Sequence, residues 1–162
     1  MDRDEFIPVG SGFEDARAGG LMTSPVASVF ATDSLADAAV KMREADCGAL
    51  PVVDAQHHPI GMITDRDIAL HIAPRGLNGK RVQVMDCMTE NVVSCDLTDH
   101  VDRCLRLMAR NQVRRLPVVD DAGVLTGIIS QADLARHAEE HAGKGERRSV
   151  AAMVGAISEP VV

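Results

Sequence analysis

Two segments of the sequence place a hydroxyl side chain and a carboxylate three residues apart, directly behind a glycine and two apolar residues. They read Gly61-Met62-Ile63-Thr64-Asp65-Arg66-Asp67 and Gly127-Ile128-Ile129-Ser130-Gln131-Ala132-Asp133. When such a hydroxyl residue precedes a helix, its side chain and the following acid satisfy backbone N–H groups as a capping box. The structural interpretation of both segments is therefore a helix cap.

The same residue types also suit a phosphorylated sugar. The N-terminus of a helix offers unpaired N–H groups to a phosphate. A carboxylate one turn into the helix can accept hydrogen bonds from the two hydroxyls of a ribose. A glycine on the preceding strand allows a close approach to the backbone. Because the pattern occurs twice at matched places, a binding interpretation stands beside the capping one.

An internal duplication determines where the two segments lie. The pentapeptide Leu-Pro-Val-Val-Asp occurs at residues 50–54 and again at 116–120, an offset of 66 residues. The same offset, without a gap, pairs Met22-Thr23 with Met88-Thr89, Thr32-Asp33 with Thr98-Asp99, and Met42 with Met108. Self-similarity at a fixed period indicates a repeated supersecondary unit.

Each copy predicts the element order β-α-β-β-α. In the first copy, a strand over 26–30 leads to a helix whose apolar residues fall at helical spacing, followed by a hairpin and a second helix from 64–65. The second copy has its first strand over 92–95 and its second helix from 130–131. The apolar residues of the first helix are Leu35, Ala38, Ala39 and Met42.

A copy of about 50 residues buries too little surface to be stable alone. We therefore expect an α/β (α+β) fold in which two β-α-β-β-α repeats pack as one pseudo-twofold module. The predicted organisation is an acidic lead-in over 1–20, repeats over 21–80 and 81–141, and a linker with a short apolar helix over 142–162.

Composition narrows the functional classes. The 162 residues carry a formal charge of −7, the wrong sign for a domain that binds nucleic acid by neutralising phosphates. No apolar run approaches the roughly 18 residues that span a membrane, and the start lacks a signal-peptide pattern, so we expect a cytoplasmic protein. The four cysteines form no C-x-x-C pair, and neither a disulfide scaffold nor a closed zinc site is indicated.

The repeated strand followed by Gly-apolar-apolar-Thr/Ser-x-x-Asp resembles the cystathionine β-synthase (CBS) domain, and the tandem over about 21–138 resembles a CBS pair, or Bateman module. Three segments are similar to stand-alone two-CBS proteins of the bacterial hypoxic response type. These are Thr64-Asp65-Arg66-Asp67-Ile68, Gln112-Val113-Arg114-Arg115-Leu116-Pro117 and Ala132-Asp133-Leu134-Ala135-Arg136-His137.

The resemblance implies a regulatory module without catalytic activity that binds AMP, ADP or ATP, or secondarily S-adenosylmethionine or NAD, in clefts between the repeats. It places Thr64 and Ser130 at the phosphate, and Asp67 and Asp133 at the ribose hydroxyls. The segments ending at Ser28 and Ser94 would offer main-chain groups and aliphatic walls to adenine. It also implies a homodimer that signals to an unidentified protein partner, with no required cofactor.

Other polar residues have two interpretations each. Arg114 and Arg115 could balance ligand phosphates, since guanidinium pairs with them bidentately, or lie solvated at a strand edge. His137 and His141 are spaced to face one metal ion, but two histidines without a third ligand are an incomplete site, so no metal is expected. The alternative function is a stress-associated interaction or structural dimer protein that binds no nucleotide. An enzyme is the least supported class.

Overall fold

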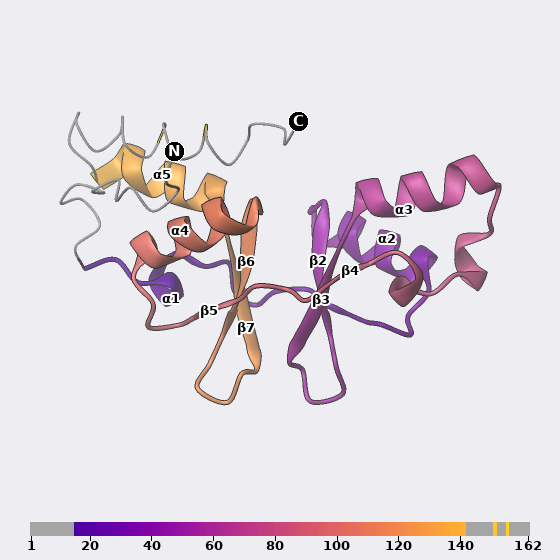
Figure 1. The fold of residues 1–162 in the computed structure, drawn as a ribbon, viewed down its shortest axis with the longest axis horizontal. Coiled ribbons are helices and arrows are strands. Elements are labelled where there is room, and N and C mark those ends of the chain that lie inside the picture. The colour runs from indigo at the N-terminus through magenta and orange to yellow at the C-terminus, as the bar shows by residue number, and fades with distance from the viewer. Residues whose placement is uncertain (1–14, 142–150, 152–154, 156–162) are drawn as a thin grey trace. The chain divides into compact units, whose positions relative to one another are not determined.

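The computed structural model describes residues 15–141, 151 and 155 (Figure 1). The start of the predicted lead-in and nearly all of the predicted linker and C-terminal helix therefore lie outside the described residues. At the described end of the lead-in, the short helix α1 (Ala18–Leu21) begins, and the Ala18 side chain is fully buried.

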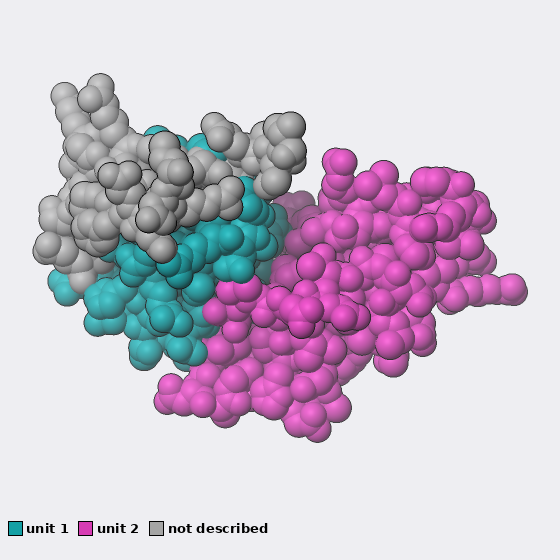
Figure 2. Space-filling view, viewed as in Figure 1, with its two compact units in different colours: residues 1–24, 95–118, 127–162 teal, residues 25–94, 119–126 magenta. Residues whose placement is uncertain are grey.

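The chain forms two compact units, and each unit takes segments from both halves of the sequence (Figure 2). Unit 1 comprises residues 1–24, 95–118 and 127–162, and unit 2 comprises residues 25–94 and 119–126. The sequence repeats and the compact units are thus different divisions of the same chain.

Unit 2 contains most of the first repeat and is built on a four-stranded sheet of order β1-β2-β3-β4. Strand β1 runs parallel to β2, and the other neighbours are antiparallel. Three short 3-10 helices lie between α3 and β4, at Ala73–Arg75, Gly79–Arg81 and Val84–Asp86. The remaining elements are β1 (Val29–Phe30), α2 (Leu35–Glu44), β2 (Ala49–Val53), β3 (Pro59–Thr64), α3 (Asp65–Ile72) and β4 (Thr89–Glu90).

The buried side chains of unit 2 explain why α2 and β2 form where they do. All five residues of β2 are buried, as expected for a strand between two neighbours. Helix α2 begins after Ser34, whose side chain accepts the Asp37 N–H, and it buries Leu35, Ala38 and Met42. Ala39 was predicted on the same apolar face but is exposed.

Unit 1 contains most of the second repeat and a three-stranded sheet of order β5-β6-β7. Its elements are α1, β5 (Cys95–Asp96), α4 (Val101–Asn111), β6 (Arg115–Val119), β7 (Leu125–Ser130) and α5 (Gln131–His141), with the far ends of β6 and β7 belonging to unit 2. Among the described residues, no helix is long and apolar enough to cross a membrane.

The mixed α/β class and the repeated order β-α-β-β-α are confirmed. The predicted first strands were too long at their start: only Val29–Phe30 of 26–30 pairs, and the second copy pairs Cys95–Asp96 rather than 92–95. Both segments are apolar enough for a strand, but each approaches a partner strand for only two residues.

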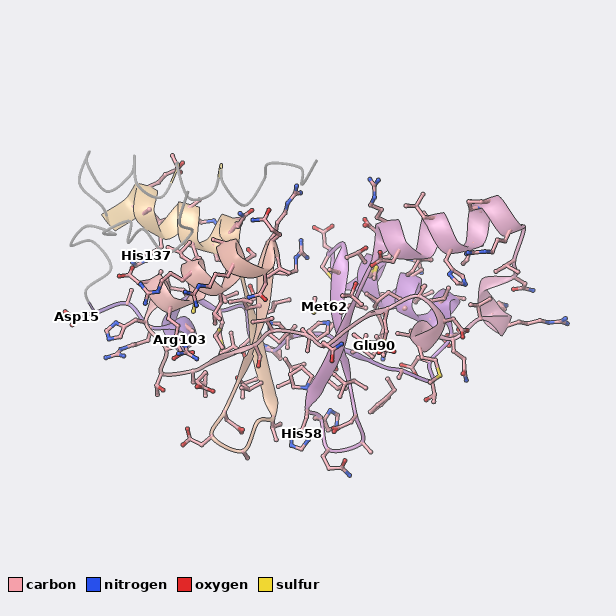
Figure 3. All side chains as sticks on the ribbon, in the orientation of Figure 1. Asp15, His58, Met62, Glu90, Arg103 and His137 are labelled. Atoms are coloured by element: carbon pink, nitrogen blue, oxygen red, sulfur yellow. The ribbon has the colours of Figure 1, made fainter. Side chains whose placement is uncertain are left out.

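The Met-Thr dipeptide that opens each repeat pairs with the hairpin of the other repeat. Thr23 N–H donates to the Ile128 carbonyl over 2.8 Å, and Ile128 N–H donates back over 3.1 Å. In unit 2, Gly61 and Met62 pair with Glu90 and Thr89, so that Met62 and Glu90 lie on adjacent strands (Figure 3). The Met-Thr segment of each repeat therefore pairs with the last strand of the other repeat, the strand that leads into the Thr/Ser-x-x-Asp segment.

Candidate functional site

The first candidate site lies in unit 2, where β3 passes directly into α3. Thr64 is the N-cap residue, and its hydroxyl oxygen accepts the Asp67 N–H over 3.1 Å. Asp67 Oδ2 in turn accepts the Thr64 N–H over 2.9 Å and the Thr64 hydroxyl over 2.6 Å. The predicted capping box is confirmed, and it fixes the Asp67 carboxylate through one oxygen.

The N–H groups of the first turn of α3 are already occupied. Asp65 N–H donates to the Gly48 carbonyl over 3.0 Å. Arg66 N–H donates to Asp65 Oδ1 over 2.7 Å, and Asp67 N–H donates to Thr64 as described above. An anion at this helix end would have to displace the Asp65 carboxylate.

The second candidate site, in unit 1, repeats this geometry where β7 passes into α5. Asp133 Oδ2 accepts the Ser130 N–H over 2.8 Å and the Ser130 hydroxyl over 2.6 Å, while Asp133 N–H donates to the Ser130 hydroxyl oxygen over 3.3 Å. One difference is an ion pair of 3.5 Å between Arg136 Nη1 and Asp133 Oδ1. The position that matches Arg136 in the first repeat is Leu70.

The structure brings Arg114 next to the second site through its backbone. The Arg114 carbonyl accepts the N–H of Gln131, the first residue of α5, over 2.9 Å. Gly48 makes the matching contact in the first repeat. Arg115 is the first residue of β6 and is half-buried. Their contact with a phosphate stays a prediction.

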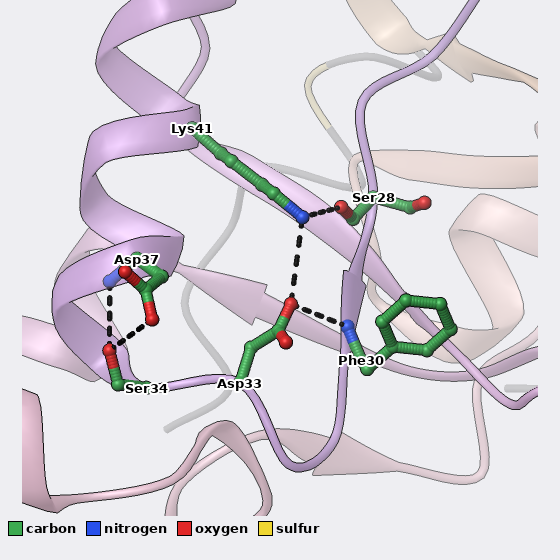
Figure 4. A network of polar contacts seen from close by, with 6 residues as sticks. All are labelled: Ser28, Phe30, Asp33, Ser34, Asp37 and Lys41. Atoms are coloured by element: carbon green, nitrogen blue, oxygen red, sulfur yellow. Dashed lines mark hydrogen bonds and ion pairs between the residues drawn. The ribbon is translucent and has the colours of Figure 1, made fainter.

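The two predicted adenine-facing serines are placed differently. Ser28 belongs to unit 2 with Thr64 and Asp67, and its carbonyl accepts the Lys41 ammonium over 3.0 Å (Figure 4). Lys41 also lies 3.5 Å from Asp33, which ties this loop to α2. Ser94 is the last residue of the 25–94 segment of unit 2, whereas Ser130 and Asp133 belong to unit 1. Their contact with adenine stays a prediction.

The motif glycines allow the close approach to the backbone that the sequence predicted. The group that approaches Gly61 and Gly127 in the structure is another segment of the chain. A Cβ on Gly61 would lie 2.8 Å from the Thr89 carbonyl oxygen, and one on Gly127 would lie 2.9 Å from that of Thr23. The recurrence of Met-Thr at the 66-residue offset was the available signal for this contact.

Two residues near the sites were not singled out from sequence. The pKa of the Cys87 thiol, which packs against the core of unit 2, is raised by burial and by the negative charges of Asp67 and Asp86. Gln131 is only 9% exposed, and its Nε2 has no hydrogen-bond partner. Among the residues that the structure describes, no group of three or more His, Cys, Asp or Glu side chains could hold a metal ion.

Curated relatives match most of the chain. Hypoxic response protein 1 of Mycobacterium tuberculosis is 35% identical over 122 residues, which are 75% of this chain and 85% of that protein. The uncharacterized protein MK0525 of Methanopyrus kandleri is 35% identical over 103 residues, which are 64% of this chain but only 53% of that protein. The match therefore spans only about half the length of MK0525.

Solved structures share the fold over a similar part of the chain. Hypoxic Response Protein I with two coordinated zinc ions has a TM-score of 0.67 and 34% identity, covering 75% of this chain and 98% of that chain. The CBS domain pair of protein MJ0100, in complex with 5′-methylthioadenosine and S-adenosyl-L-methionine, has a TM-score of 0.65 and 25% identity, covering 74% and 93%. The model of the CBS domain matches residues 18–74 and 84–140. This chain therefore belongs to the CBS domain family and carries two copies of the domain, one for each repeat.

Proposed function

We propose that this protein is a regulatory module without catalytic activity that binds adenine nucleotides at the strand-to-helix junctions of its two repeats. The observation that carries the proposal is the state of Asp67. Its Oδ2 is held by the Thr64 N–H and hydroxyl, whereas no partner of Oδ1 is found within the described part of the chain. A carboxylate fixed in this way is pre-organised to accept ribose hydroxyls, which limits the entropy lost on binding.

The solved relative supports the choice of an adenosine compound. The CBS pair of MJ0100 is in complex with two molecules that both contain adenosine. This chain has three Phe and neither Trp nor Tyr, so the adenine ring would be held by aliphatic side chains and read by backbone groups rather than stacked between large aromatic rings. The proposed ligands are AMP, ADP and ATP.

Thermal unfolding with a panel of AMP, ADP, ATP, NAD and S-adenosylmethionine tests the proposal. A ligand at 100 times its Kd adds about 2.7 kcal/mol to the stability of the folded state. The double substitution Asp67→Asn and Asp133→Asn retains an oxygen for the cap but replaces the second acceptor with an N–H donor. We expect this variant to unfold cooperatively and to lose the stabilisation by nucleotide.

The chain contains a matched control for the loss of a capping carboxylate. Ser34 and Asp37 make two of the three contacts of the Thr64/Asp67 cap at the start of α2, with 2.6 Å between the hydroxyl and carboxylate oxygens and 3.1 Å from the Asp37 nitrogen to the Ser34 hydroxyl oxygen (Figure 4). Asp37→Asn should leave the nucleotide effect intact. If no nucleotide at millimolar concentration stabilises the wild type, both junctions are structural caps, and an interaction or structural dimer protein becomes the better description.

We also propose that the protein acts in the cytoplasm as a homodimer whose ligand state is read by a protein partner. This part of the proposal rests on the family alone. Light scattering of the same samples at micromolar concentration checks the dimer, and a mass of one chain would contradict it.

A further inference from the structure

Helices α2 and α4 occupy matching places in the two repeats and bury the same side, but their exposed sides differ in charge. The buried pairs at the 66-residue offset are Leu35/Val101, Ala38/Cys104 and Met42/Met108. The pairs on the opposite side are Asp37/Arg103, Val40/Arg106 and Glu44/Arg110, and all six of these residues are exposed. The two repeats therefore share the buried side of this helix and not its surface.

The exposed side of α4 carries a stripe of three arginines. Residues spaced by three and seven positions fall on one side of a helix, as Arg103, Arg106 and Arg110 do. Asp102 is the only acidic residue of α4, so the helix has a formal charge of three minus one, or +2. Arg103 Nε lies 3.0 Å from Asp99 Oδ2, but the Arg103 side chain is 57% exposed, and such surface pairs contribute little. The stripe thus presents positive charge at the surface.

The matching stripe of α2 is acidic around an apolar centre. Val40 is 40% exposed and lies between Asp37 and Glu44 on the same side of the helix. The two basic residues of α2 lie off this stripe. Lys41 contacts the loop before the helix (Figure 4), and the helical period places Arg43 at the edge of the stripe. The stripes of α2 and α4 therefore have opposite charge.

Opposite charges on matching helices decide how two copies of the chain can associate. Contact between the α4 helices of two copies brings arginine against arginine, and contact between the α2 helices brings acid against acid. Juxtaposed like charges are unfavourable by several kcal/mol. Contact of α2 with α4 instead brings the two acids to the arginines, and it covers Val40 with the aliphatic part of an arginine side chain. Charge thus favours the contact between unlike helices.

We infer that the stripe Asp37/Val40/Glu44 on α2 docks on the stripe Arg103/Arg106/Arg110 on α4 of a second copy of this chain. In a dimer with a twofold axis this contact forms twice, with α2 of each copy against α4 of the other. The inference rests on the homodimer of the proposed function and adds the two faces that meet and the head-to-tail order of the copies.

Reversing the charge of one stripe tests the inference. Asp37→Arg with Glu44→Arg should weaken dimerisation by about tenfold or more, because both contacts become repulsive. The formal net charge changes from −7 by four to −3, so repulsion between whole chains predicts the opposite effect. Arg103→Glu with Arg110→Glu should also weaken the dimer, and all four substitutions in one chain should restore it. Sedimentation over a dilution series measures the dissociation constant.

A matched control makes the same change of charge elsewhere in unit 2. Glu90 in β4 and Asp121 at the hairpin turn are both exposed. Glu90→Arg with Asp121→Arg also raises the net charge by four but leaves α2 unchanged. This variant should dimerise at least as well as the wild type. A loss equal to that of the α2 variant would mean that the charge of α2 has no special role.

Cross-linking keeps the inference testable if the reversed variants do not fold, because it needs one surface substitution in each copy. A mixture of Val40→Cys and Arg106→Cys chains, treated with a short bifunctional maleimide, should give a covalent dimer of the two variants. Val40→Cys alone should give no more covalent dimer than the wild type, whose own four cysteines set the background.

The outcomes separate the orientation from the dimer itself. If Val40→Cys alone is cross-linked above background, or if reversing the charge of α2 leaves the dimer intact, the docking of α2 on α4 is wrong although the protein dimerises. If the wild type has the mass of one chain at micromolar concentration, the proposed homodimer itself fails.

Discussion

At the scale of single residues, Gly61 and Gly127 show that a motif position can be required by packing rather than by a ligand. We expect Gly127→Ala to destabilise the fold by about 1–3 kcal/mol, the usual effect of forcing a methyl group into a packed site. The new Cβ would lie 2.9 Å from the Thr23 carbonyl oxygen and would also meet the Met22 sulfur. Denaturant unfolding measures the loss.

A second glycine controls for the effect of the substitution itself. Gly20 lies in α1 with nothing within 4 Å of its Cβ position, and alanine is favoured over glycine in helices by about 1 kcal/mol. Gly20→Ala should leave stability unchanged or raise it. Equal losses at both positions would show that the close approach of Thr23 is not what requires Gly127.

At the scale of elements, the matching helices α2 and α4 of the two repeats differ in their N-terminal caps. Ser34 caps α2 and accepts the Asp37 N–H, whereas the matching residue before α4 is His100, which makes no side-chain cap. We expect His100→Ser to stabilise the protein by about 1 kcal/mol, because it restores an acceptor for the first turn of α4. The melting temperature should rise by about 2–4 °C.

The reverse change completes this test. Ser34→Ala removes the Asp37 N–H contact of 3.1 Å and should destabilise the protein by a similar amount. A gain at α4 that also appears with His100→Ala would mean that removing the imidazole, rather than adding a cap, is responsible.

The elements also show how far sequence reasoning reaches. The capping pairs Thr64/Asp67 and Ser130/Asp133 were predictable because each is set by residues three positions apart. The short length of β1 and the pairing of β4 with β3 were not predictable from the sequence. Both depend on a partner strand that is distant in sequence, because a strand extends only as far as its partner pairs with it. The free amide of Gln131 likewise depends on packing from other segments.

At the scale of the whole molecule, the predicted repeat boundary at residues 80 and 81 cuts through a compact unit. Val84 is fully buried in the core cluster of unit 2, and β4 at Thr89–Glu90 pairs with β3. The hairpin tip of the second repeat also belongs to this unit, where Leu125 N–H donates to the His57 carbonyl over 2.9 Å. The similarity between the two repeats identifies the copies. It does not show that a compact unit built mainly from one copy also includes segments of the other.

Fragments of the chain test this division. A fragment of residues 1–80 lacks both Val84 and β4. Without the buried Val84 side chain the core is exposed, and without β4 the edge of β3 has unpaired backbone groups. A fragment of residues 1–94 retains both and should be clearly the more stable, with a cooperative transition in denaturant. Mixing 1–80 with 81–162 should restore protection of the Met62 amide hydrogen, because the second fragment returns β4, in which Thr89 pairs with Met62. Equal stability of the two N-terminal fragments would mean that the sequence repeat, and not the compact unit, is what folds.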